Sequence, residues 1–124
     1  MIRRKAFAGW LGWGLLGIGT AALAQALSTR NAQGVLVGSD GHVLYTYDAD
    51  AAGRSACTGP CLAVWPAYAA TAGAPAARDF SVITRADGEH QWAFRGKPLY
   101  RYAADQKPGE ALGDGVHGSW PVLR

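Results

Sequence analysis

The sequence predicts a mainly β protein: two tandem repeats with a period of 55 residues pack as one pseudo-symmetric domain behind an N-terminal signal helix. Two observations support this prediction. The sequence aligns with itself, without a gap, at an offset of 55 residues. Each aligned unit contains short runs of β-branched and aromatic residues separated by Gly-containing turns. No amphipathic helix is evident after the first 26 residues.

Residues 1–26 have the three parts of a secretory signal peptide. A basic cluster at residues 3–5 precedes 19 uncharged residues, and small side chains around Ala24 and Ala26 offer cleavage sites. We therefore expect cleavage near Ala24 or Ala26 and a periplasmic or secreted protein. An uncleaved membrane anchor is the alternative, although five glycines weaken such a helix. No cysteine follows the apolar run, so no lipid anchor is expected, and the two arginines leave twin-arginine export open.

The charge balance argues against a nucleic-acid partner. The whole chain has 12 basic and 9 acidic residues and a net charge of +3. Three of the basic residues lie in the signal, so the remainder carries nine charges of each sign. A neutral domain has no excess cations with which to displace the counterions of a nucleic acid. We expect a monomer that contacts an envelope component or a small ligand.

The register of the repeat defines the expected units. Each unit carries a Tyr-x-Tyr-x-x-Asp pattern and a later Trp-Pro pair. These residues are Tyr45, Tyr47, Asp50, Trp65 and Pro66 in the first unit and Tyr100, Tyr102, Asp105, Trp120 and Pro121 in the second. We expect repeat 1 at 27–66, an Ala-rich linker at 67–79 and repeat 2 at 80–124, all within one domain at 27–124. A unit of about 40 residues is too small to fold alone, so the two are expected to share a core.

Each unit is expected to form a meander of two or three short strands. The expected strands cover residues 35–37 and 43–47 in the first unit and 80–84, 91–94 and 99–102 in the second. Asp40-Gly41 and Asp87-Gly88 are the expected turns between them. A short helical turn is expected near residues 61–64.

Cys57 and Cys61 are the only cysteines, and a close pair in an oxidising compartment is expected to form a disulfide. Closing so short a loop stabilises the fold by about 2 kcal/mol on the chain-entropy estimate. A redox role is the alternative, but the spacing is Cys-x-x-x-Cys and not Cys-x-x-Cys. At the offset of 55 the cysteines align with Leu112 and Val116. These apolar partners predict buried positions, and buried cysteines are inert.

The paired tyrosines have two interpretations. Along a strand, the two tyrosines of each motif point to the same face. They could form a stacking platform for a sugar ring, such as one of peptidoglycan. The favoured interpretation is that they belong to the core, with each phenol hydrogen-bonded to a polar neighbour. The aspartate that ends each motif suits the capping of turn N–H groups.

Metal binding and catalysis have little support in the sequence. His42, His90 and His117 are isolated and lack the spacing of metal ligands. The serines lie in no Gly-x-Ser-x-Gly pattern. Glu89 and Glu110 are the only glutamates, and each lies in an apparent turn or loop. We therefore expect no metal, no cofactor and no catalytic residue.

Taken together, these residues resemble a family of secreted repeat proteins and predicted lipoproteins described by a Y-x-(F/W/Y)-x-x-D motif. The resemblance covers essentially the whole chain after the signal. It is carried by both copies of the tyrosine motif, by the Cys57–Cys61 loop with the following Trp-Pro, and by Gly113-Asp114-Gly115 before the second Trp-Pro. The family has no established biochemical activity, so the resemblance implies a class and no reaction. Unlike many members, this chain lacks the lipid-attachment cysteine and looks soluble after cleavage.

The expected function is that of an exported, non-catalytic binding or interaction module with its binding surface at the junction of the repeats. The alternative is a periplasmic redox or metal-handling accessory protein that uses the Cys57/Cys61 pair.

Overall fold

The computed structural model describes residues 28–124, so the signal prediction for residues 1–26 lies outside the described residues. The elements are β1 (Ser28–Arg30), β2 (Leu36–Gly38), α2 (Pro60–Val64), β3 (Phe80–Thr84), β4 (His90–Phe94) and β5 (Lys97–Pro98). Within residues 28–124, no helix is long and apolar enough to cross a membrane.

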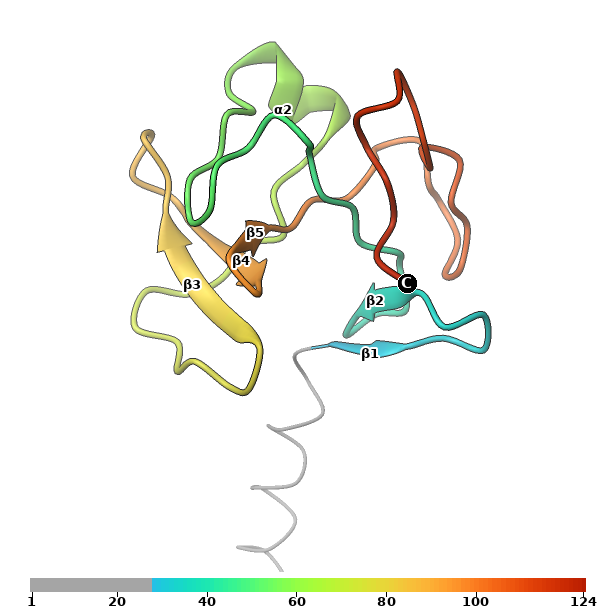
Figure 1. The fold of residues 1–124 in the computed structure, drawn as a ribbon, viewed down its shortest axis with the longest axis horizontal. Coiled ribbons are helices and arrows are strands. Elements are labelled where there is room, and N and C mark those ends of the chain that lie inside the picture. The colour runs from blue at the N-terminus through green and yellow to red at the C-terminus, as the bar shows by residue number, and fades with distance from the viewer. Residues whose placement is uncertain (1–27) are drawn as a thin grey trace, which may run out of the picture.

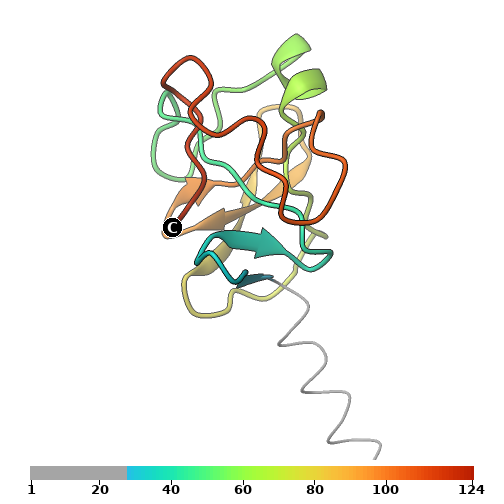
Figure 2. The ribbon, with the colours of Figure 1, turned by 90° about the vertical axis from the view of Figure 1, so that its right-hand side faces the viewer.

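The strands form two small antiparallel sheets, one from each repeat. β1 pairs with β2, and β3, β4 and β5 form a three-stranded sheet in that order. Figure 1 shows the two sheets on opposite sides of the molecule, with the C-terminus beside β2. Figure 2 shows that long irregular loops and the single turn of α2 cover one end of these sheets. The prediction of a mainly β chain built from two small sheets is confirmed.

The segments at 43–47 and 99–102 were expected to be strands of their own meanders, and the structure differs. They pair with each other: Tyr45 N donates to Tyr100 O at 2.8 Å, and Tyr100 N donates to Tyr45 O at 2.9 Å. Thr46 N also donates to Pro121 O at 3.1 Å. The start of each segment still pairs with its own repeat, where Leu44 N donates to Leu36 O at 3.1 Å and Leu99 N donates to Trp92 O at 2.9 Å. From Tyr45 and Tyr100 onward, the segments are held by isolated bridges to the opposite repeat.

Structurally equivalent residues of the two repeats are 55 positions apart in the junction but 54 positions apart in the first hairpin of each repeat. The hairpin turns are closed by equivalent bonds, Asn31 N to Val35 O at 2.9 Å and Arg85 N to Glu89 O at 2.8 Å. An ungapped alignment is therefore one residue out of register before the motif. The turn at Asp40-Gly41 and the one-turn helix near residues 61–64 occur where the sequence predicts them.

One core serves both repeats. It consists of two clusters, and each contains buried residues from both halves of the chain. The first holds Val35, Val37, Val43, Tyr45, Cys57, Trp65, Tyr100, Trp120 and Val122. The second holds Leu36, Leu44, Tyr68, Trp92, Phe94 and Leu99.

Tyr68 shows that the start of the segment interpreted as a linker is packed. Its backbone N donates to Leu99 O at 2.9 Å, and its carbonyl accepts a hydrogen bond from Trp92 N at 2.9 Å. Ala70 N donates to His90 O at 3.1 Å, so residues 68–70 lie along β4. The Ala-rich composition of this segment suggests a linker, but the segment contains one buried aromatic residue, Tyr68.

The loop before the second Trp-Pro turns a glycine inward. A Cβ on Gly113 would lie 2.7 Å from the ring atoms of both Trp65 and Tyr102. The neighbouring Leu112 was expected to be buried because it aligns with Cys57, but it is 59% exposed. The alignment fails here because the loop places Gly113 against the aromatic rings and leaves Leu112 outside.

Gly113→Ala is expected to lower the free energy of unfolding by about 1–3 kcal/mol, because the added methyl group must displace two packed rings. The measurement is urea unfolding followed by tryptophan fluorescence. Leu112→Ala is the matched control and is expected to change stability by less than about 0.5 kcal/mol. Equal effects of the two substitutions would contradict the packing described here.

Candidate functional site

The two copies of the tyrosine motif exchange hydrogen bonds across the junction. Tyr45 Oη donates to Asp105 Oδ2 at 2.6 Å, and Tyr100 Oη donates to Asp50 Oδ2 at 2.7 Å. Both tyrosines are fully buried. A pseudo-twofold axis therefore runs between Tyr45 and Tyr100, and the first tyrosine of each motif is completed by the aspartate of the other.

Each aspartate also closes a loop of its own repeat. Asp50 Oδ1 accepts a hydrogen bond from Ala56 N at 2.7 Å, and Asp105 Oδ1 accepts one from Leu112 N at 2.8 Å. Burial raises the pKa of Asp50, although the hydrogen bonds from Ala56 and Tyr100 oppose that shift. Both oxygens of each carboxylate are thus engaged in structure.

The remaining aromatic residues form one stack through the junction. The indoles of Trp65 and Trp120 are parallel at 4.0 Å. Tyr47 stacks on Trp120 at 4.1 Å, and Tyr102 lies on Trp65 at 4.4 Å. The second tyrosine of each motif therefore lies half-buried at an end of a four-ring column whose rings alternate between repeats. The prolines that follow the tryptophans fix the column, because their carbonyls accept hydrogen bonds from backbone N–H groups of the opposite repeat.

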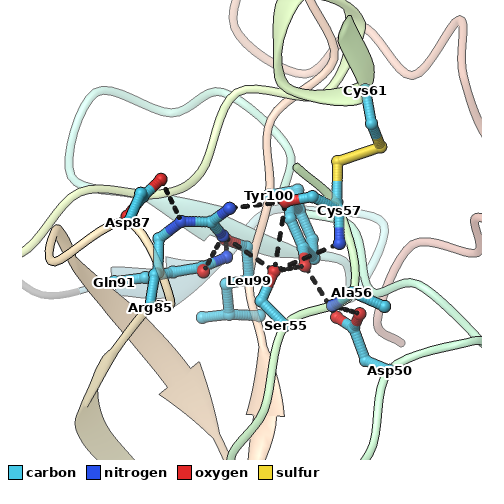
Figure 3. The surroundings of a disulfide bond; sticks show 10 residues. All are labelled: Asp50, Ser55, Ala56, Cys57, Cys61, Arg85, Asp87, Gln91, Leu99 and Tyr100. Carbon is cyan, nitrogen blue, oxygen red and sulfur yellow. Dashed lines mark hydrogen bonds and ion pairs between the residues drawn. A yellow bond between two sulfur atoms is a disulfide. The ribbon is translucent and has the colours of Figure 1, made fainter. Parts of the chain in front are cut away.

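Cys57 and Cys61 form the predicted disulfide, with their Cα atoms 5.4 Å apart. Figure 3 shows a buried arginine beside it. Arg85 Nη1 donates to Ser55 Oγ and to Gln91 Oε1, each at 2.7 Å, and Nη2 donates to the Cys57 carbonyl. Arg85 is 5% exposed and belongs to repeat 2, so it ties the disulfide loop of repeat 1 to the sheet of repeat 2.

The same network reaches the tyrosine motif. Ser55 Oγ lies 2.6 Å from Tyr100 Oη, which also donates to Asp50. A continuous chain of hydrogen bonds thus connects Arg85, Ser55, Tyr100 and Asp50. At Tyr45 the described residues form no such network: besides its bond to Asp105, the Tyr45 hydroxyl accepts a hydrogen bond from Gly113 N at 3.1 Å.

A cavity of about 260 Å³ opens at the junction and is referred to below as the junction cavity. One wall comes from repeat 1 and carries Thr46, Tyr47, Asp48 and Asp50; the other comes from repeat 2 and includes Arg95 and Lys97. One wall is thus acidic and aromatic, and the other is basic. This cavity lies where the binding surface was expected, at the junction of the repeats.

The equivalent place on the other side of the pseudo-twofold axis is bridged by an ion pair. Arg101 aligns with Thr46, and Asp40 aligns with Arg95. Arg101 Nη1 donates to Asp40 Oδ2 at 2.7 Å and so connects the two walls there. A threonine opposite an arginine cannot form this bridge, which leaves the junction cavity open.

Sequence reasoning identified Tyr47 and Asp50 as motif residues, but it did not identify the other residues that line this cavity or the buried Arg85. A signal in the sequence that could have located the cavity is the set of positions at which the two repeats differ, such as Thr46 in repeat 1 and Arg101 in repeat 2. The histidines remain apart, and among residues 28–124 no group of three His, Cys, Asp or Glu residues is placed to hold a metal ion.

Comparison with known proteins gives one result. A family model described as a secreted repeat of unknown function matches the chain twice, over residues 27–69 and 81–124. Each match contains one tyrosine motif and one of the two sheets. No curated protein and no solved structure matches the chain.

Alkaline pH is expected to destabilise the fold through the two exchanged tyrosines. Burial and, to a lesser extent, the Asp50 carboxylate raise the pKa of Tyr100 to about 12, and burial with Asp105 also raises the pKa of Tyr45. Their contribution is complete below the unfolded pKa of about 10 and is lost as the pH rises toward the folded values, by up to about 1.4 kcal/mol per pH unit for each tyrosine. Urea unfolding between pH 8 and pH 11.5 measures this loss. Tyr100→Phe should show a shallower decline than the wild type, and an identical decline would contradict the assignment.

Removal of the buried guanidinium is expected to be costly. Arg85→Met leaves Gln91 Oε1 and the Cys57 carbonyl without their donor, which should lower the free energy of unfolding by about 3 kcal/mol. Arg54→Met is the control, because Arg54 is exposed and its guanidinium has no partner among the described residues. Thermal unfolding of both variants with the disulfide intact gives the comparison, and similar melting temperatures would disprove the role of Arg85.

Proposed function

Because the chain belongs to this family of secreted repeat proteins, we propose that it is an exported, non-catalytic binding module whose ligand occupies the junction cavity. An extracellular or periplasmic location follows from the family. Cleavage near Ala24 or Ala26 and release without a lipid anchor complete the proposal. No feature of residues 28–124 favours the redox or metal-handling alternative.

The observation that carries the proposal is a pair of unmatched charges, one on each wall of the cavity. Asp48 is exposed, and its carboxylate has no partner within the described part of the chain. Lys97 is likewise exposed, and its ammonium group has no partner there. Charged groups that do not pair within the protein remain available to a ligand with both donors and acceptors.

Two of the side chains that line the cavity are held in place by contacts within the protein. Tyr47 is held by its stack on Trp120, and the Asp50 carboxylate is fixed by Ala56 N and Tyr100 Oη. A site whose side chains are already ordered loses little conformational entropy on binding. The same hydrogen bonds support a non-catalytic role, because both oxygens of Asp50 are already occupied.

The dimensions and chemistry suit a small polar ligand about the size of one sugar ring. The volume of about 260 Å³ is just below the roughly 300–1,000 Å³ of sites for drug-sized ligands. The Asp48 carboxylate can accept hydrogen bonds from ligand hydroxyls, Lys97 can donate to ligand oxygens, and the Tyr47 ring can contact the apolar face of a sugar. A sugar unit of a cell-wall glycan has the matching groups: hydroxyls, further oxygen acceptors and an apolar ring face.

Titration of the ¹⁵N-labelled mature protein with a peptidoglycan disaccharide tests the proposal. Saturable shifts are expected in the amides of residues 46–52 and 95–98. Asp48→Ala should weaken binding by about tenfold, because it removes one charged hydrogen-bond acceptor. Glu89→Ala, which removes an exposed carboxylate away from the cavity, should leave the affinity unchanged. Shifts that do not saturate, or equal effects of both substitutions, would refute a ligand at this site.

A further inference from the structure

A second hollow lies beside the junction cavity and is entirely basic in its charged residues. It has a volume of about 140 Å³, and four of its residues are cationic. These are Arg30 of β1, Arg95 of the β4–β5 turn, Lys97 of β5 and Arg124 at the end of the chain. No aspartate or glutamate residue is part of its lining. Arg95 and Lys97 border both spaces, so the basic hollow adjoins the junction cavity.

The charges of the hollow are only partly balanced by the protein. Arg95 pairs with Asp79 at 3.2 Å and Arg124 with Asp114 at 3.0 Å, and both arginines are about two-thirds exposed. Exposed pairs of this kind are held weakly, so these arginines remain available to another anion.

The other two cations have no carboxylate partner within residues 28–124. The Arg30 guanidinium donates to a carbonyl, Gly34 O, at 3.1 Å, and Lys97 has no partner of any kind there. Converging cations repel one another, so an anion between them gains the attraction of several at once.

Arg95 holds its place at a cost in backbone conformation. It and Gly96 form the two-residue turn between β4 and β5, with φ of 49° and 82°. Two consecutive residues with positive φ define a type I′ turn, in which Asn or Gly is strongly preferred at the first position. A long cationic side chain is unfavourable there, and strained residues of this kind concentrate at functional sites. The guanidinium carbon lies 5.0 Å from the centre of the Phe94 ring, which directs it along the wall of the hollow.

We propose that this basic hollow is an anion site that binds a phosphoryl group. Guanidinium groups donate paired hydrogen bonds whose geometry matches phosphate oxygens. A phosphoryl dianion has three terminal oxygens for the several donors here, whereas a carboxylate is satisfied by one arginine. Phe94 and Leu123 form the apolar part of the wall.

The shared border with the junction cavity identifies the ligand class further. Because Arg95 and Lys97 border both spaces, one ligand molecule could place its phosphoryl group against these two residues and its ring against Tyr47 and Asp48. The ligand is therefore a saccharide that bears a phosphoryl group. This second step rests on the proposed function, whereas phosphate binding in the basic hollow does not.

The basic hollow belongs to one side of the pseudo-symmetric molecule. At the offset of 55, Arg95 and Lys97 align with Asp40 and His42, so the corresponding turn in repeat 1 has an acidic residue in place of the arginine. A stoichiometry of one phosphoryl group per chain follows.

Calorimetric and NMR titrations of the full mature protein with inorganic phosphate test the anion site. Saturable binding with shifts at residues 95–97 and 124 is expected, together with weakening as salt concentration rises. Lys97→Gln should weaken binding by about tenfold, whereas Lys107→Gln, an exposed lysine outside both cavities, should not change it. Arg95→Asn should weaken phosphate binding without lowering the melting temperature, because asparagine suits the turn. Absence of saturation, or loss of affinity in Lys107→Gln equal to that in Lys97→Gln, would overturn the anion site.

Parallel titrations with glucose 1-phosphate and glucose separate the two steps. Tighter binding of glucose 1-phosphate than of inorganic phosphate, with added shifts at residues 46–50, supports the phosphorylated saccharide. Equal affinity of both phosphates overturns the saccharide step and leaves the anion site standing. Sedimentation with vesicles containing phosphatidic acid distinguishes a lipid source, and binding to vesicles without binding to glucose 1-phosphate would likewise overturn the saccharide step.

Discussion

The fold depends on an exchange of two hydrogen bonds between a tyrosine of one repeat and an aspartate of the other. Because Tyr45 and Tyr100 are fully buried, their hydroxyls must find partners inside the protein, and those partners exist only when both repeats are present. Each aspartate also closes a loop of its own repeat. The exchange therefore couples the interior of one half to the loop geometry of the other, and the alternating stack of aromatic rings extends that coupling to the surface.

The buried residues keep the pseudo-twofold symmetry of the repeats more closely than the surface residues do. The exchanged tyrosines, the stacked tryptophans and the carbonyls of the following prolines are related by the pseudo-twofold axis, so packing preserves the symmetry. The junction cavity appears where the side chains break it. Arg101 and Asp40 bridge the two walls on one side, whereas Thr46 and Arg95 leave them unbridged on the other. The proposed binding properties thus arise from the differences between the copies, while stability arises from their identity.

Local features of the sequence predict local structure well. The strand expected at residues 80–84 coincides with β3, the Asp87-Gly88 turn joins it to β4, and a helical turn occurs next to Cys61. Pairing across the junction could not be predicted, because periodicity within a segment carries no information about which distant segment it contacts. Arg85 was missed for a related reason: arginine is normally exposed, and its burial is possible only because Ser55 and the Cys57 carbonyl of the disulfide loop and Gln91 of β4 converge on it. For the candidate site, the sequence predicts the location at the junction of the repeats and two of the lining residues, Tyr47 and Asp50, but not the charged residues of the opposite wall.

The reciprocal hydrogen bonds also bear on how such a chain can be assembled. Each repeat supplies one tyrosine and one aspartate, so a single repeat would satisfy the same contacts by pairing with a second copy of itself about a true twofold axis. That arrangement is an isologous interface, the kind that closes a homodimer. Joining the two copies in one polypeptide makes their association intramolecular, with an effective concentration set by the connecting segment and independent of dilution. It also allows the two faces to diverge in charge and shape, which identical subunits cannot do.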